Sequence, residues 1–202
     1  MISKKSLKVA LVAAMLSAGY AQASTELVVN GNFESFTGGA FTGYETVGNG
    51  QTTITGWNVS DTSVDLINNG QYGAINGTSI DMLGTPGPGA ISQTLNTVAG
   101  KSYTLSFDLS RNPGDSSALF VSLNGGNATE YTGTTTATPY SMNFIATSNS
   151  TVLKFESAAT VAYSGAVIDN VSVMAAVPEP ETYGMLLAGL GLIGFMARRR
   201  KA

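Results

Sequence analysis

Short stretches in the middle of the chain alternate between apolar and polar residues. The clearest is Ser102–Ser110, where Tyr103, Leu105, Phe107 and Leu109 fall on one side of an extended chain and polar residues on the other. This period of two predicts a half-buried β-strand with those four side chains in the core. Weaker stretches of the same kind predict further strands at residues 54–59, 79–83, 91–95, 119–123, 142–146, 152–155 and 167–173.

Residues that favour turns separate these stretches. Asparagine and glycine, which tolerate a positive φ, are concentrated at 68–70, 112–115 and 124–127. The segment 85–89, Thr-Pro-Gly-Pro-Gly, fits neither a helix nor a central strand. Since no helical periodicity occurs within residues 24–176, the pattern predicts one all-β domain there, an antiparallel β-sandwich or barrel.

The first 23 residues are typical of a signal peptide. Three lysines within the first eight residues precede an apolar stretch, Val9–Gly19, and Ala21-Gln22-Ala23 follows with the small residues that signal peptidase requires. The alternative is an N-terminal membrane anchor, but the apolar stretch is shorter than the roughly 20 residues that a spanning helix needs. Residues 1–23 are therefore expected to be removed on export.

Residues 177–202 form a tail with three parts. Val177-Pro178-Glu179-Pro180 is followed by the uncharged segment Tyr183–Ala197 and by the basic cluster Arg198–Lys201. The uncharged segment predicts a short hydrophobic helix of about 22 Å, which is less than the hydrocarbon core of about 30 Å. This favours a transmembrane helix that is held only briefly, and the alternative is an ordinary single-pass anchor.

This tail closely resembles the PEP-CTERM sorting signal of Gram-negative bacteria. The resemblance rests on Val177, Pro178, Glu179 and Pro180, together with the short apolar helix and the basic end. It implies transient insertion in the inner membrane, recognition by an exosortase and cleavage near Pro-Glu-Pro. The product would be released or attached at the cell surface or outside the cell.

Composition excludes several kinds of chemistry. The chain contains no cysteine and no histidine, which excludes disulfides, imidazole metal sites and nucleophiles with a histidine base. Between residues 24 and 177 three basic residues stand against eleven acidic ones, a net charge near −8 (three minus eleven). That charge repels nucleic acid and fits divalent cations or neutral glycans better.

Asp169 is the most informative acidic residue, because it interrupts an apolar strand pattern. At a period of two it shares its side of the strand with Val167, Val171 and Val173. An isolated buried carboxylate is very costly, and a calcium ion would be a natural partner where basic side chains are scarce. The alternatives are a bulge that turns Asp169 outward and a role as acceptor for backbone amides.

Several motifs occur in the order found in one family of domains. They are Leu27–Glu34, Gly56-Trp57, Ser79–Leu83, Ile91–Phe107 and Val167–Val173. Together they resemble the galactose-binding-like jelly roll of carbohydrate-binding modules, and most of all the choice-of-anchor C branch of bacterial surface proteins. The resemblance implies an eight-stranded antiparallel sandwich, no catalytic function, and a structural calcium ion (Ca2+) that joins the first and last strands. The matching ligand positions are Glu34, the carbonyl of Lys101 and Asp169, with a carbonyl near Asn32.

Aromatic side chains are the candidates for sugar stacking, since sugar sites need flat apolar faces beside polar groups. Trp57 is either a stacking platform or, as its place in the resembling fold favours, a core residue. The tyrosines expected at the surface are Tyr44, Tyr72, Tyr131, Tyr140 and Tyr163. A carboxylate pair for glycoside hydrolysis would come from Asp61, Asp65, Asp81 and Asp108, but no spacing singles out two of them.

The sequence thus predicts a non-enzymatic, exported bacterial surface or extracellular-matrix protein. Its jelly roll would serve adhesion or association with exopolysaccharide. The alternative is a dedicated carbohydrate-binding module with one specific glycan. An exposed aromatic platform distinguishes the two, because only the second function requires it.

Overall fold

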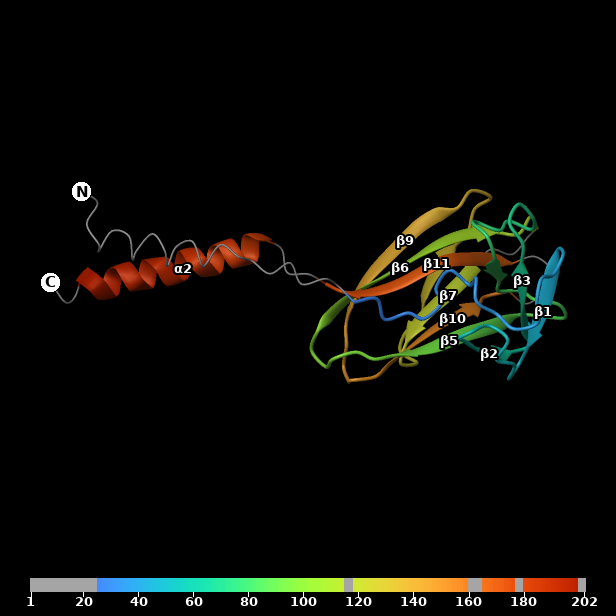
Figure 1. The fold of residues 1–202 in the computed structure, drawn as a ribbon, viewed down its shortest axis with the longest axis horizontal. Coiled ribbons are helices and arrows are strands. Elements are labelled where there is room, and N and C mark those ends of the chain that lie inside the picture. Colours follow the sequence, from blue (N-terminus) through green and yellow to red (C-terminus); the bar gives the residue numbers. More distant parts are fainter. Residues whose placement is uncertain (1–24, 115–117, 160–164, 177–179, 200–202) are drawn as a thin grey trace. The chain divides into compact units, whose positions relative to one another are not determined.

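The computed structural model describes residues 25–114, 118–159, 165–176 and 180–199. Residues 25–176 form one compact unit that contains all the described strands and the hydrophobic core (Figure 1). A unit with a core of its own is expected to fold by itself. The predicted signal peptide, residues 1–23, lies outside the described residues, and so do Val177, Pro178 and Glu179 of the sorting motif.

The tail contains one helix, α2 (Pro180–Arg199), of 20 residues. Among its described side chains, Leu186, Leu190 and Ile193 are exposed. Within the described part of the chain, no helix is both long enough and apolar enough to cross a membrane. Insertion of this tail in a membrane stays a prediction.

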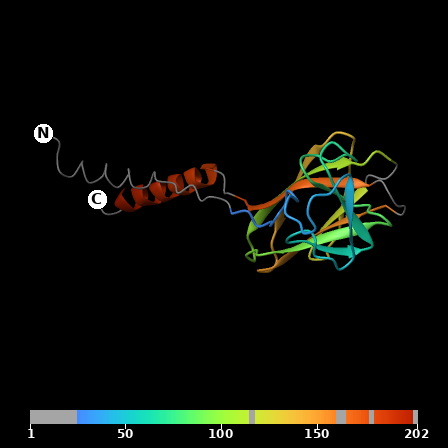
Figure 2. The same ribbon diagram turned by 45° about the vertical axis from the view of Figure 1, so that its right-hand side comes forward.

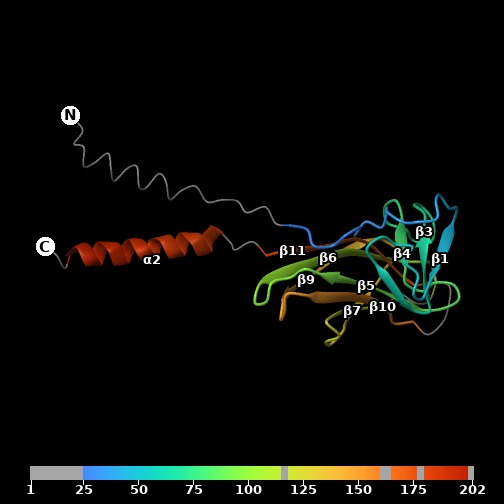
Figure 3. The same cartoon turned by 60° about the horizontal axis from the view of Figure 1, so that its bottom comes forward.

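The domain is a sandwich of two antiparallel sheets, which confirms the predicted fold class. The six-stranded sheet has the order β1-β3-β4-β11-β6-β9, with the bounds Tyr44–Gly48, Ser63–Ile67, Ser79–Asp81, Ala166–Ala175, Ser102–Arg111 and Thr138–Ile145. The five-stranded sheet has the order β2-β5-β10-β7-β8, with the bounds Asn58–Asp61, Gly89–Leu95, Thr151–Ser157, Ala118–Leu123 and Thr129–Thr132. Figure 3 shows β6 and β11 in one layer and β7 and β10 in the other, and in Figure 2 β11 crosses the length of the sandwich.

The core lies between the sheets and is built from the alternating positions. Tyr103, Leu105, Phe107 and Leu109 of β6 are all buried, as their period predicts. Phe107 meets Phe155 of the opposite sheet with ring centroids 5.3 Å apart. The long alternating strand therefore supplies the central layer of apolar contacts.

The described residues hold eleven strands, three more than the eight that the family resemblance implies. The stretches expected as strands correspond to β2, β4, β5, β6, β7, β9, β10 and β11. The pattern misses β3, Ser63–Ile67, because its alternation is short: Ile67 falls on the same side as Ser63 and Asp65. It misses β1 and β8 because both are short and mostly polar strands at a sheet edge.

A bulge in β11 changes the side to which Asp169 points. The register of β11 on β6 shifts between Asp169 and Ser172, where Asn170 has a φ of 51°. Ile168 and Val171 therefore both belong to the core cluster. Asp169 does not share a face with Val171, as strict alternation predicts, but lies on the opposite face of the sheet.

Candidate functional site

The outer face of the six-stranded sheet, which is the face turned away from the sandwich core, carries paired carboxylates. Asp65 on β3 lies opposite Asp81 on β4 in the antiparallel register. Their neighbours Leu66 and Ile80 belong to the core, so the alternation directs both aspartates to the outer face. Both are nevertheless buried, with 6% and 2% of their surface exposed.

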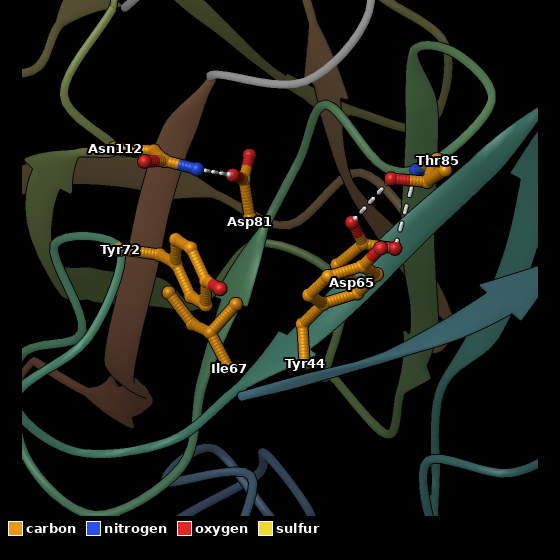
Figure 4. Close-up of a pocket in the computed structure, with 7 residues that line it drawn as sticks. All are labelled: Tyr44, Asp65, Ile67, Tyr72, Asp81, Thr85 and Asn112. Carbon is orange, nitrogen blue, oxygen red and sulfur yellow. Dashed lines mark hydrogen bonds between the residues drawn. The ribbon is translucent and has the colours of Figure 1, made fainter. Parts of the chain in front are cut away.

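A pocket of about 200 Å³ lies at these aspartates (Figure 4). Two tyrosines line it from β1 and from the loop after β3. The rings of Tyr44 and Tyr72 meet edge to face, with centroids 5.9 Å apart and planes at 83°. They are 47% and 43% exposed, so the pocket combines half-exposed aromatic rings with buried carboxylates. Its full lining is Tyr44, Asp65, Ile67, Tyr72, Asp81, Thr85 and Asn112.

Neutral donors hold the carboxylate of Asp65. Its Oδ1 accepts hydrogen bonds from the hydroxyl of Thr46 (2.8 Å) and the backbone N–H of Thr85 (3.2 Å). Its Oδ2 accepts a hydrogen bond from the hydroxyl of Thr85 (3.1 Å). The negative charge is therefore fixed in place without a neighbouring cation among these partners.

Asp81 is held in the same way. Its Oδ1 accepts from the backbone N–H of Leu83 (2.9 Å), and its Oδ2 accepts from the side-chain amide of Asn112 (2.7 Å). Burial raises the pKa of Asp81 from 3.8 to about 6, because the hydrogen bond from Asn112 offsets only part of the lost hydration. The negative charge of Asp65 raises this pKa further.

The backbone that presents Tyr72 is strained. Tyr72 has a φ of 50°, which is unusual for a bulky side chain, and the next residue, Gly73, has a φ of 82°. A side chain at Gly73 would meet the carbonyl oxygen of Arg111 at 2.2 Å, so only glycine fits there. The hydroxyl of Ser110 donates to the carbonyl of Gly73 (2.5 Å), which ties this loop to β6. Such strain is concentrated at functional sites in proteins.

A second pair of carboxylates on this face consists of Glu34 and Asp169. Asp169 is fully buried, and its Oδ2 accepts from the backbone N–H of Asn76 (3.2 Å) and the hydroxyl of Ser79 (3.0 Å). The backbone N–H of Thr78 donates to Oε1 of Glu34 (2.7 Å). Burial raises the pKa of Asp169 to about 6, and the charge of Glu34 adds to this effect. Asp169 thus lies next to a bulge and accepts backbone amides, as both alternatives in the sequence suggest.

Lys101 is not brought to this pair. Asp169 lies opposite Asp108 on β6, and Lys101 precedes Asp108 by seven residues. At about 3.3 Å per residue this corresponds to a separation of about 23 Å. The carbonyl of Lys101 instead accepts from the backbone N–H of Ala146 (2.9 Å). The segment that does adjoin Glu34 and Asp169 is residues 76–78.

The oxygens of Glu34 and Asp169 suit a hard cation such as Ca2+ in chemical kind. Among the described residues, however, no three acidic, histidine or cysteine side chains converge on one point. A calcium ion here would need hydroxyl or carbonyl oxygens beside the two carboxylates to reach its usual six to eight ligands.

The remaining candidate residues lie elsewhere. Trp57 is 2% exposed and contacts Phe33, with ring centroids 5.5 Å apart, so it is the core residue that the sequence favours. Tyr131 and Tyr140 are half-buried and pack on the edge and face of Phe107. Tyr163 lies outside the described residues.

Of the four aspartates considered as a pair, the structure brings together Asp65 and Asp81. Asp61 lies on β2 of the other sheet, 3.5 Å from the ammonium of Lys154, and Asp108 accepts from Asn170 (2.9 Å). One signal in the sequence could have found the pair. Asp65 and Asp81 each interrupt a short apolar strand, as Asp169 does.

The tail and the domain together define the class and the family of this protein. Residues 176–201 match the PEP-CTERM protein-sorting motif, which implies export, exosortase processing and sorting to the cell surface. Residues 26–174 match the family described as "protein of unknown function (DUF642)", and the chain belongs to this family. No curated protein matches the chain in sequence.

The sandwich is similar to several solved structures. One, described as "CBM4 structure and function", is 18% identical and covers 74% of this chain and 99% of its own, with a TM-score of 0.42. A family 35 carbohydrate binding module from Clostridium thermocellum is 15% identical, with coverages of 65% and 99% and a TM-score of 0.44. An exo-beta-1,3-galactanase from Phanerochaete chrysosporium is 13% identical, with a TM-score of 0.42. The match covers 68% of this chain but only 30% of the enzyme's length.

Proposed function

We propose that this protein is a non-catalytic glycan-binding protein of the bacterial surface or matrix, and that the Tyr44–Tyr72 pocket binds the sugar. The observation that carries the proposal is the pair of half-exposed tyrosine rings beside hydrogen-bonding groups in one pocket. Sugar rings offer apolar C–H faces and polar hydroxyls, so they require this combination.

The size of the pocket supports recognition of one sugar residue. Its volume of about 200 Å³ is below the roughly 300–1,000 Å³ of pockets that enclose drug-sized ligands. One sugar ring would occupy the pocket while the rest of the glycan lies in solvent. This arrangement suits an end or a branch of an extracellular polysaccharide, and the sorting tail would deliver the domain to the place where such polymers occur.

The test is a glycan array probed with residues 24–176, followed by calorimetry on the ligands that bind. Tyr44→Ala and Tyr72→Ala should each weaken binding about tenfold or more, since each removes one ring from the pocket. Ile145→Ala is the matched control, because Ile145 is 66% exposed on β9 and does not line the pocket. Binding that is unchanged by both tyrosine substitutions, or that fails for every glycan, would contradict the proposal and favour a packing role without a sugar ligand.

A further inference from the structure

Two of the described residues that line the pocket, Asp65 and Asp81, carry a negative charge, and none of the described lining residues is basic. Among the described residues, the groups that donate to Asp65 and Asp81 are neutral hydroxyl, amide and backbone groups. Both are nearly fully buried, so water screens their charges poorly. A ligand that enters this pocket therefore meets a negative potential at close range.

None of the three basic residues between positions 24 and 177 lines the pocket. The ammonium of Lys154 lies 2.8 Å from Glu156 and 3.5 Å from Asp61 on the five-stranded sheet. Nη1 of Arg111 donates to the carbonyl of Gly114 (3.3 Å). Lys101 lies just before the start of β6, whereas Ser110 and Arg111 lie at the other end of this strand. That other end adjoins the loop that carries Tyr72, because the hydroxyl of Ser110 donates to the carbonyl of Gly73. The counter-charge has to come from the ligand.

Resting on the proposed function, we infer that the pocket selects a glycan with a free primary amine, such as a de-N-acetylated hexosamine. Its ammonium group donates up to three hydrogen bonds, and the two aspartates are acceptors. The half-exposed rings of Tyr44 and Tyr72 add attraction for a cation near their faces. Acetylation removes the charge and enlarges the group, and a uronic acid is repelled.

The test uses residues 24–176 and four oligosaccharides of equal length. Oligomers of glucosamine, N-acetylglucosamine and galacturonate compare the free amine with the acetylated amine and with a carboxylate. A galactosamine oligomer distinguishes the two hexosamines. Calorimetry at matched ionic strength should give an affinity for an amino sugar at least about tenfold above that for the acetylated one, and no binding of galacturonate. Comparing ligands on the unaltered protein makes this arm independent of whether any variant folds.

Substitutions then locate the source of the preference. Asp65→Asn and Asp81→Asn should each abolish most of the preference for the amine and leave binding of the acetylated oligomer. Glu130→Gln removes one charge from an exposed site on β8 and should leave the preference unchanged. Tyr44→Ala should weaken binding of both oligomers.

The outcomes separate this inference from the proposed function. If neutral glycans bind in a Tyr44-dependent manner and the amine brings no advantage, the inference is overturned and the proposed function stands. If no glycan binds, both fail. If a lysine-rich peptide binds as tightly as the amino sugar, the pocket recognises ammonium groups of proteins instead, and the glycan preference is overturned.

Discussion

Replacing Asp81 with asparagine removes one buried negative charge and nearly preserves the shape of the side chain. In the folded domain burial raises the pKa of Asp81 from 3.8 to about 6. The folded state therefore binds this proton more tightly than the unfolded chain does. The resulting stability is fully present below about pH 4 and is lost as the pH rises through about 6. The difference between 3.8 and about 6 corresponds to about 3 kcal/mol of unfolding free energy.

Urea unfolding followed by tryptophan fluorescence measures this effect, because Trp57 is the single tryptophan and is buried. Between about pH 4 and 7 the unfolding free energy of the unaltered domain should fall by about 2.4 kcal/mol more than that of Asp81→Asn, because part of the full effect already lies below pH 4. Asp169 titrates in both proteins, so its contribution cancels in the comparison. Glu130→Gln should follow the unaltered domain at every pH. Parallel pH curves for Asp81→Asn and the unaltered domain would refute the reasoning.

Two further predictions test the core and the second carboxylate pair. Phe107→Ala should lower the unfolding free energy by about 3–5 kcal/mol through the cavity that it leaves, whereas Val152→Ala, at a side chain that is 39% exposed, should cost about 0.5 kcal/mol or less. If Glu34 and Asp169 hold Ca2+, EDTA should lower the melting temperature by several degrees, and calcium should restore it. A hundredfold excess over Kd adds about 2.7 kcal/mol. Asp169→Asn should lose most of this response. If neither EDTA nor calcium changes the melting temperature of the unaltered domain, the site does not bind the ion.

The sequence predicts those parts of the fold that depend on local patterns. The strand at Ser102–Arg111 is long and strictly alternating, so its position and its core face both follow from its residues. The strand at Ser63–Ile67 does not follow, because it is short and is covered on both faces, with its polar residues Ser63 and Asp65 buried as well. Strand content is thus recognised most easily where one face meets solvent.

The site was less predictable, because it depends on register. Asp65 and Asp81 are sixteen residues apart, and only the pairing of β3 with β4 places them opposite each other. Asp169 follows from the apolar pattern of its strand, and Glu34, whose charge acts on Asp169, follows only from the family resemblance, whereas Lys101, from the same resemblance, lies before the start of β6. The bulge at Asn170 was among the alternatives, but no pattern in the sequence fixes its position.

Asp81 and Asp169 are buried on the outer face of the six-stranded sheet, and burial raises the pKa of each to about 6. Near neutral pH both are ionised, so their buried charges lower the unfolding free energy of the ligand-free domain. Neither residue packs in the sandwich core, so apolar replacements on this face would remove the cost without disturbing the core. Charges that lower stability are retained in proteins where they contribute to function. Any cation that binds the folded state at either carboxylate pair would offset the cost and raise stability by mass action. We therefore expect the domain to be more stable with its ligand at the cell surface than as a free protein in dilute buffer.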